Sequence, residues 1–241
     1  MELEQLEVVS LKKACMNKLQ KVILSGQFRI GERLPSEREL AKMLGVSRPV
    51  LHEAIVALNM QGLVHIEARR GVFVSDYRCE SSMALMNTLL EYEEGDFDPE
   101  LFRSLMEGRL LIERETARLA AEKRDEQTLQ KLQELVEKGK NLLNSNSQEL
   151  TDYDFQFHLE IALASGNRMY PMILNSLKGV HRNLAGKFYR DILGKPQVQT
   201  VLDFHQSLLD AVARQDPQTA SQIMADLLRH GEENINRILF D

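Results

Sequence analysis

The sequence has little that would suit a secreted or membrane-spanning protein. It has two cysteines, Cys15 and Cys79, whose separation fits neither a metal-binding motif nor a secreted disulfide scaffold. It has no apolar run long enough to span a membrane. The first residues include Glu2, Glu4 and Glu7 without an apolar core, so we expect no signal peptide there. These absences favour a globular protein of the cytoplasm.

The composition is ordinary for a globular protein, but the charge is unevenly distributed. Hydrophobic residues are 43% and charged residues 27% of the 241 positions, and the formal net charge is −6. Residues 8–78 carry 12 Lys and Arg against 6 Asp and Glu, whereas residues 79–241 carry 18 against 27. A basic segment joined to an acidic remainder is typical of a DNA-binding module fused to another domain. The sequence therefore predicts two domains, residues 1–78 and residues 79–241.

The basic segment has the pattern of a helix-turn-helix. Apolar residues recur at helical spacing over residues 8–25, which predicts a first helix. Ser36 and Glu39 form an S-x-x-E capping box, so we expect a second helix that begins at Ser36 and stops at Gly45. Ser47 stands where it would cap a third helix. Two helices joined by a short turn that contains glycine are typical of this DNA-binding motif.

A β-hairpin is predicted directly after the third helix. That helix has Pro49 in its first turn, where a missing N–H costs little, and it ends near Gly62. Residues 63–67 and 71–74 alternate as two strands around the turn at 68–70, which holds two arginines. Three helices followed by a hairpin make a winged helix-turn-helix, whose third helix would enter the major groove.

This segment resembles the DNA-binding domain of the GntR family of transcription regulators over roughly residues 8–75, in the stretch RLPSERELAKMLGVSRPVLHEAIVALNMQGLVHIEARRGVFV. The family usually has arginine where His52 stands, and a neutral histidine cannot make the bidentate contact of arginine with guanine. The operator preference or affinity would therefore differ from that of relatives. The alternative for each basic residue is an ordinary solvated surface position. The resemblance implies DNA contacts by Arg38, Ser47, Arg48, Pro49, His52, Arg69, Arg70 and Gly71.

The remainder of the chain reads as helices joined by short loops. Strand patterns cease after Tyr77, and Asp98-Pro99 and Asp216-Pro217 each pair a capping residue with a first-turn proline. Short connections favour antiparallel neighbours, so we expect a mainly α fold with a seven-helix antiparallel bundle in this half. The expected helices cover about 82–92, 98–123, 125–143, 149–164, 166–193, 197–215 and 217–239.

Ionisable residues on these apolar helices suggest a metal site. Asp154 and His158 are four residues apart and share one face of a helix, and His205 and His230 lie on two later helices. One carboxylate and three imidazoles that converge inside a bundle would suit Zn²⁺, Ni²⁺, Mn²⁺ or Fe²⁺. The alternative is that each histidine is an ordinary core or surface residue.

The segments RLLIERETARLAAEKRDEQTLQKL, DYDFQFHLEIALASGN and FHQSLLDAVARQDPQTASQIMADLLRH resemble the FCD effector-binding domain of the FadR subfamily, over about residues 82–238. The resemblance implies a divalent metal that helps hold a small carboxylate effector. Arg109 would pair with that carboxylate, or instead with Glu113 on its own helix. Asn167 would contact the effector or cap a helix, while His181 matches no ligand of the family. The implied metal ligands are Asp154, His158, His205 and His230.

Together these features predict a transcription regulator rather than an enzyme. We expect a homodimer that binds a pseudo-palindromic, double-stranded operator, most simply as a repressor whose affinity for DNA the effector changes. One alternative is a regulator with a purely structural metal and no effector. The other is a metal-dependent hydrolase tethered to DNA, but the sequence has no H-E-x-x-H and no nucleophile motif.

Overall fold

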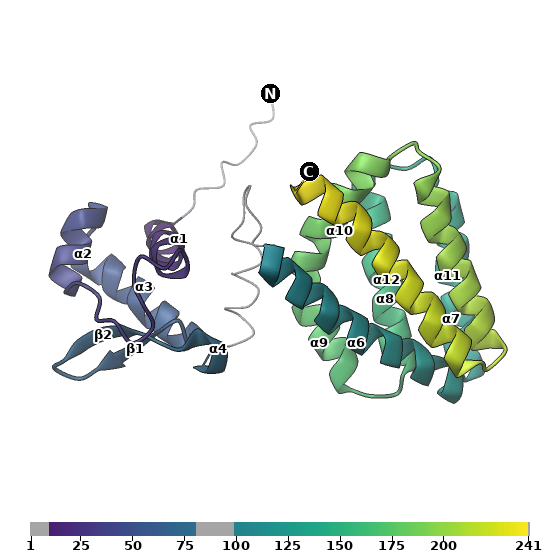
Figure 1. The fold of residues 1–241 in the computed structure, drawn as a ribbon, viewed down its shortest axis with the longest axis horizontal. Coiled ribbons are helices and arrows are strands. Elements are labelled where there is room, and N and C mark those ends of the chain that lie inside the picture. The colour runs from purple at the N-terminus through teal and green to yellow at the C-terminus, as the bar shows by residue number, and fades with distance from the viewer. Residues whose placement is uncertain (1–9, 81–98, 241) are drawn as a thin grey trace, which may run out of the picture. The chain divides into compact units, whose positions relative to one another are not determined.

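The computed structural model describes residues 10–80 and 99–240. The chain divides into two compact units, Met1–Tyr92 and Glu93–Asp241 (Figure 1). The predicted helix at 82–92 lies outside the described residues. Helices dominate the described chain, and one two-stranded sheet accompanies them, which confirms the mainly α fold class.

The first unit has the predicted order of three helices and a hairpin. The capping box is present, because the Ser36 side chain accepts from the Glu39 amide while the Glu39 carboxylate accepts from the Ser36 amide. Gly45 ends the second helix in the left-handed conformation, with φ of 68°. The elements are α1 (Leu11–Leu24), α2 (Glu37–Leu44), α3 (Arg48–Gln61), β1 (Val64–Glu67), β2 (Gly71–Val74) and the short α4 (Tyr77–Glu80).

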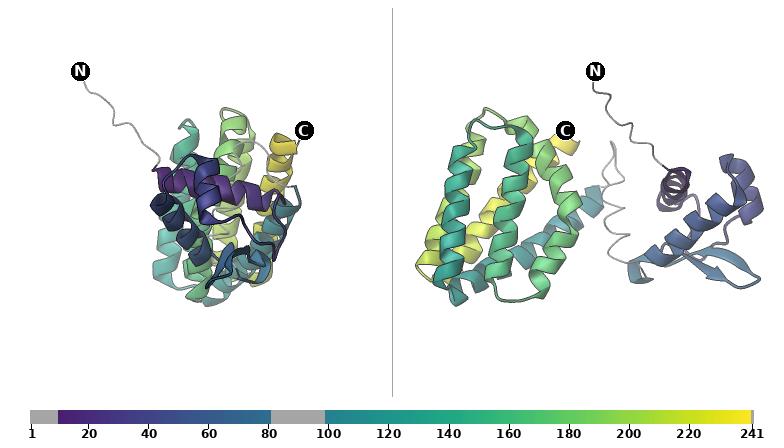
Figure 2. Two further views of the ribbon diagram at one scale, coloured as in Figure 1. Left: turned by 90° about the vertical axis from the view of Figure 1, so that its left-hand side faces the viewer. Right: turned by 180° about the vertical axis from the view of Figure 1, so that it is seen from behind.

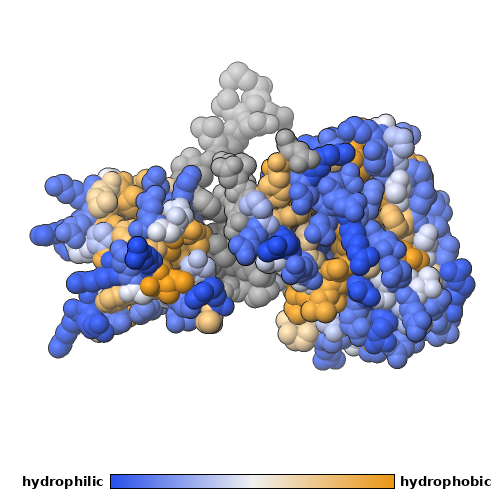
Figure 3. Space-filling view, viewed as in Figure 1, coloured by the Kyte–Doolittle hydropathy of each residue, from blue (hydrophilic) through white to orange (hydrophobic). Residues whose placement is uncertain are grey.

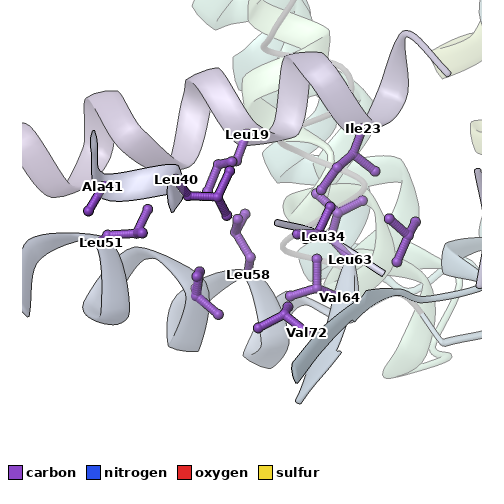
Figure 4. Close-up of a cluster of buried hydrophobic side chains, with 12 residues drawn as sticks. Leu19, Ile23, Leu34, Leu40, Ala41, Leu51, Leu58, Leu63, Val64 and Val72 are labelled. Carbon is purple, nitrogen blue, oxygen red and sulfur yellow. The ribbon is translucent and has the colours of Figure 1, made fainter. Parts of the chain in front are cut away.

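A compact apolar core fixes α3 against the rest of this unit. Leu51 and Leu58 of α3 are fully buried and pack with Leu19 of α1, Leu40 of α2 and Val72 of the hairpin (Figure 4). Because these side chains occupy one face of α3, its opposite face stays exposed. The core therefore determines which residues of the third helix are available to DNA.

The hairpin forms an antiparallel pair in which Val64 lies opposite Val74 and Glu67 opposite Gly71. Arg69 occupies the turn between them with φ of 62°, a left-handed conformation that is uncommon for a residue with a side chain. Arg33 also bridges to the second strand, so the segment between α1 and α2 supports the hairpin. This arrangement confirms the predicted winged helix-turn-helix.

The second unit is a bundle of helices joined by short turns. The first and last of these helices, teal and yellow in Figures 1 and 2, run side by side in opposite directions. The Asp216 side chain accepts from the Thr219 amide and so caps the last helix as predicted. Between residues 99 and 240 the helices are α6 (Pro99–Lys123), α7 (Glu126–Asn141), α8 (Ser147–Ala164), α9 (Met169–Ser176), α10 (Lys178–Ile192), α11 (Gln197–Ala213) and α12 (Pro217–Phe240).

The single helix predicted over 166–193 is two helices in the structure. Leu177 separates α9 from α10 with φ of −91° and ψ of 7°, outside the α-helical region. Its amide donates to the carbonyl of Leu174, three residues earlier, which tightens the last turn of α9. The periodic apolar pattern continues across this break in the sequence, although Gly179 follows Leu177 by two residues.

None of the described helices is both long and apolar enough to cross a bilayer. The face of each unit seen in Figure 3 is largely hydrophilic, with small hydrophobic areas between the charged side chains.

Candidate functional site

The structure places the predicted DNA-contacting residues of α2 and α3 on an exposed surface. Arg38 lies in the first turn of α2, and Arg48 and Pro49 open α3, all with exposed side chains. Ser47 precedes α3 in an extended conformation, and its side chain makes no capping hydrogen bond. The N-terminal turn of the third helix thus presents a cationic and a hydroxyl group together. Such groups contact phosphates and base edges when a recognition helix lies in the major groove of DNA.

His52 does not stand alone on this surface. Its Nδ1 lies 3.0 Å from Oε1 of Glu37, so the imidazole joins α3 to the start of α2. The side chain of His52 remains 58% exposed, which leaves it accessible from the same side of α3. Its contact with this carboxylate uses part of the hydrogen-bonding capacity of the imidazole.

The tip of the wing is also exposed and basic. Arg70 pairs with Glu67 and lies over the Phe73 ring, with its guanidinium carbon 5.4 Å from the ring centroid. Gly71 has φ of 120°, and a Cβ there would approach Nε of Arg33 to 2.9 Å. Arg33 therefore packs on the wing and is a basic residue of this surface that the sequence patterns did not single out.

In the second unit, three of the four predicted metal ligands come together. Asp154, His158 and His205 each offer a ligand atom within 4.8 Å of the others, and all three are buried. The first two lie on α8 and the third on α11. Nε2 of His205 is 3.7 Å from one carboxylate oxygen of Asp154, and Nε2 of His158 is 3.9 Å from the other.

The remaining ring nitrogens of the two histidines are held by neighbours. Nδ1 of His158 lies 2.5 Å from Oε2 of Glu113, and Nδ1 of His205 lies 3.0 Å from the hydroxyl of Tyr153. Nε2 of His205 has no hydrogen bond within the described part of the chain. Histidines that bind metals are oriented in this way, with one nitrogen fixed by an outer partner and the other directed at the ion. The donors present therefore fit a divalent metal.

Asp154 is the centre of this cluster. The hydroxyl of Tyr189 donates to its Oδ1 at 2.8 Å, and Nε2 of His181 lies 3.0 Å from its Oδ2. Both partners come from α10, so the carboxylate joins α8 to α10 as well as to α11. The sequence patterns had not assigned a role to either partner, because nothing in their spacing relates them to the D-x-x-x-H pair.

Burial and charge set the protonation of these groups. Burial raises the pKa of Asp154, but the surrounding imidazoles outweigh it and hold the pKa well below its usual range. Burial likewise raises the pKa of Glu113, yet Arg109 and His158 lower it to about 2. Burial lowers the pKa of His205 to about 3, so this imidazole is neutral near pH 7. An ionised carboxylate and a neutral imidazole are the forms that bind metals.

A small cavity adjoins the cluster and includes Arg109. The cavity measures about 40 Å³ and is lined by Asp154, His158 and His181 together with Arg109. Nε of Arg109 donates to Oε1 of Glu113 at 2.7 Å, and its side chain is 14% exposed. Arg109 therefore pairs with Glu113 on its own helix, as one interpretation predicted, and it also lines the cavity.

Two other predicted residues are not among those that line this cavity. His230 does not share the ligand cluster, but its Nε2 is buried without a hydrogen bond in the described part of the chain. Its ring neighbours are Phe204 and Phe188, and Phe188 lines the cavity. Asn167 accepts from the Met169 amide at 2.9 Å through its side-chain oxygen, which satisfies an amide at the start of α9. The N-cap position of α9 is occupied by Arg168, so Asn167 contacts the start of the helix from one residue earlier.

Gly139 of α7 permits the close packing that positions Tyr153. A Cβ at this glycine would lie far inside van der Waals contact with the buried Tyr153 ring. We expect Gly139→Ala to lower the free energy of unfolding by about 1–3 kcal/mol through overpacking. Displacement of the ring would also disturb the contact with His205. Chemical denaturation and metal titration of the variant would measure both effects.

Gly108→Ala is the matched control, because this helical glycine of α6 is exposed and has open space around its Cβ position. Alanine there should raise the free energy of unfolding by about 0.5–1 kcal/mol, since alanine favours a helix over glycine. Equal effects of the two substitutions would contradict the proposed contact between Gly139 and Tyr153.

Comparison with known families agrees with this architecture. Residues 104–230, more than half of the chain, match the FCD domain family. Residues 11–74 match the bacterial regulatory proteins of the gntR family. The two matched ranges fall in the two compact units.

Similar proteins match this chain over most of its length. The protein named "Uncharacterized HTH-type transcriptional regulator YcbG" of Bacillus subtilis is 28% identical over 94% of this chain and 90% of its own. The Exu regulon transcriptional regulator of Escherichia coli K12 is 29% identical over 92% of this chain and 82% of its own. The solved structure of Lar from Listeria monocytogenes covers 96% of this chain and 99% of that chain, with a TM-score of 0.63 and 19% identity, which concerns the fold alone. The chain therefore belongs to the GntR family as a FadR-type DNA-binding transcription regulator with an FCD domain, and is not an enzyme.

Proposed function

We propose that this regulator senses a small carboxylate through a divalent metal bound by Asp154, His158 and His205. The observation that carries the proposal is the buried cluster of these three donors, in which Nε2 of His158 and Nε2 of His205 face the carboxylate of Asp154. Residues 1–78 would form the DNA-binding domain and residues 79–241 the sensing domain. Zn²⁺, Ni²⁺, Mn²⁺ and Fe²⁺ all accept imidazole and carboxylate ligands.

Arg109 is the proposed partner of the effector carboxylate. Its guanidinium faces the cavity beside the metal cluster, and arginine binds carboxylates through two parallel hydrogen bonds. A bound metal would supply a second positive charge for the same anion. The pairing of Arg109 with Glu113 supports its orientation, because one nitrogen is fixed while others remain for the ligand.

The small size of the cavity suggests how effector binding would change the affinity of the regulator for its operator. About 40 Å³ holds roughly one water molecule, so a carboxylate metabolite requires the walls to move. The walls belong to α6, α8, α10, α11 and α12. A ligand that favours the opened arrangement would shift the population of regulator that binds its operator. We propose a homodimer on a two-fold operator, acting in the cytoplasm as a repressor that the effector releases.

Thermal unfolding tests the sensing proposal. The metal-loaded protein would be heated with a panel of sugar acids, hydroxy acids and dicarboxylates, and so would protein stripped by chelator. A ligand at about 100 times its dissociation constant adds about 2.7 kcal/mol to the stability of the folded state. A shift with one acid that disappears without metal is the expected result, and an equal shift in stripped protein would contradict a role for the metal.

A purely structural metal is the second candidate, and the small size of the cavity favours it. Buried donors around a space of about 40 Å³ leave little room for an effector beside the ion. In this case chelation would lower the thermal midpoint strongly while no acid of the panel changed it. The same experiment therefore separates the two candidates.

The DNA surface gives a further prediction. Operator sequences would be selected from a random duplex pool, and affinity would be measured by fluorescence anisotropy. Arg48→Ala should weaken binding by about 1–3 kcal/mol, because its exposed guanidinium lies at the N-terminal turn of α3. The charge-matched control is Arg118→Ala in α6, where the arginine pairs with Glu115 and Glu122. Equal losses for both variants would contradict a specific role for Arg48.

A further inference from the structure

His52 and Glu37 form a pair on the exposed surface of α2 and α3. Nδ1 of His52 lies 3.0 Å from Oε1 of Glu37, so the contact joins the second turn of α3 to the first turn of α2. The two side chains are 58% and 33% exposed. Because residues four apart are neighbours on a helix, His52 lies one turn after Arg48, the proposed DNA contact of α3.

The carboxylate determines which ring nitrogen of His52 carries the proton. A carboxylate oxygen accepts hydrogen bonds and cannot donate them, so the proton between the two groups belongs to Nδ1 of His52. A neutral imidazole has one N–H and one acceptor nitrogen, and its Nε2 is therefore the acceptor. The second oxygen of Glu37 is an acceptor as well. The pair thus presents only acceptor atoms to a ligand on this surface.

The major groove of DNA offers few partners for such a pair. Its hydrogen-bond donors are the amino groups of adenine and cytosine, whereas guanine and thymine place a carbonyl oxygen there. An acceptor nitrogen matches an amino group, but against a carbonyl oxygen it brings two lone pairs together. The chemistry of the pair therefore favours the two amino bases over the two keto bases.

We infer that His52 selects an amino base, adenine or cytosine, at one position of each operator half-site, and that Glu37 sets this preference by holding the proton on Nδ1. The inference rests on the proposed contact of α3 with DNA and specifies the base class that one of its residues reads. Glu37 is a positioning residue, because it acts through the histidine.

The competing role for Glu37 is a direct contact with the amino group of cytosine, which glutamate can also accept. The geometry favours the histidine. One carboxylate oxygen is already occupied by Nδ1 of His52, and the glutamate is the less exposed member of the pair. Removal of the imidazole separates the two roles, since a direct contact of Glu37 would survive it.

Operator selection with the full chain tests the inference. Sequences would be selected from a random duplex pool at pH 8, above the usual titration range of histidine. The parent protein, His52→Ala, His52→Arg and Glu37→Gln would be compared. The position read by His52 is the one whose base preference changes in His52→Ala. Fluorescence anisotropy with duplexes that differ only at this position would then measure the preference.

The parent protein should bind adenine or cytosine at this position at least about fivefold more tightly than guanine or thymine, the lower end of what one base contact contributes. The preference should disappear in His52→Ala. In His52→Arg it should change to guanine, because arginine donates to O6 and N7 of that base. In Glu37→Gln it should fall below about twofold, since an amide can donate as well as accept and leaves either ring nitrogen protonated.

The matched control is Glu53→Gln, which removes a negative charge from an exposed side chain of the same helix α3. A general gain in affinity from the lost charge would appear in both glutamate variants, because the phosphates repel either carboxylate. The base preference should change only in Glu37→Gln.

Three results would overturn the inference. They are a keto base at this position in the parent protein, an operator preference that is unchanged in His52→Ala, and a preference that is unchanged in Glu37→Gln. A fourth result would refute more than this inference. If the parent protein enriches no sequence at all, the proposed recognition of an operator by α3 fails as well.

Discussion

Asp154→Asn should lower metal affinity by more than about 100-fold while leaving the helical unit folded. The substitution keeps the shape of the side chain but removes its negative charge, the only one among the clustered donors of this site. The effect exceeds the roughly 10–100-fold loss that follows removal of an outer partner, because the carboxylate is a direct ligand in the proposed centre. Equilibrium dialysis against a chelator, with either Zn²⁺ or Ni²⁺, measures the change.

The same substitution should also remove the response to carboxylates in thermal unfolding. Its matched control is Asp152→Asn, two residues earlier on α8, where the carboxylate is partly exposed and pairs with Arg182. This control should bind metal with unchanged affinity and unfold within about 0.5 kcal/mol of the parent protein. Metal binding lost equally in both variants would show that a general change of α8, and not the loss of a ligand, is responsible.

Leu58→Ala should abolish operator binding although Leu58 is buried away from any DNA surface. The side chain is fully buried in the core of the first unit, where it packs with Leu19, Leu51 and Leu63. Truncation of a buried leucine to alanine costs about 2–5 kcal/mol, a large part of the stability of a domain of this size. Urea denaturation followed by circular dichroism would measure the loss, and anisotropy with the selected operator would measure binding.

Met60→Ala is the control on the same helix, because Met60 is 78% exposed and should change stability by less than about 0.5 kcal/mol. Leu58→Ala should leave Zn²⁺ binding intact, since every residue of its core cluster lies in the first unit. Operator binding that survives in Leu58→Ala at full affinity would contradict the proposed dependence of the DNA surface on this core.

Local rules predicted the first unit almost completely. The capping box at Ser36, the left-handed Gly45 and the hairpin around Arg69 are each determined by a few neighbouring residues, and all are present in the structure. In the second unit the caps at Asp125 and Asp216 likewise set where helices begin. The break at Leu177 was not predicted, because the helical apolar pattern continues through it, although Asn175, Ser176 and Gly179 lie beside it.

The residues of the candidate site also divide into pairs that the sequence could predict and pairs that it could not. The spacing of Asp154 and His158 alone places them on one face of α8, since residues four apart are neighbours on any helix. Spacing could also show that Arg109 reaches Glu113. It could not show that Tyr153 contacts His205, because that contact joins residues on different helices, and their pairing depends on how the helices pack.

The sequence by itself determined the family, the order of the elements and the faces of single helices, because these depend on residues within one or two turns of each other. Only the tertiary structure decided which histidines share a site. Successive residues of a helix differ by about 100° in direction, so His230 and its neighbour Gly231 point to different surroundings. The rotation of α10 and α12 about their axes is fixed by core packing with the other helices, and this packing places His181 beside Asp154 and His230 against Phe188 and Phe204.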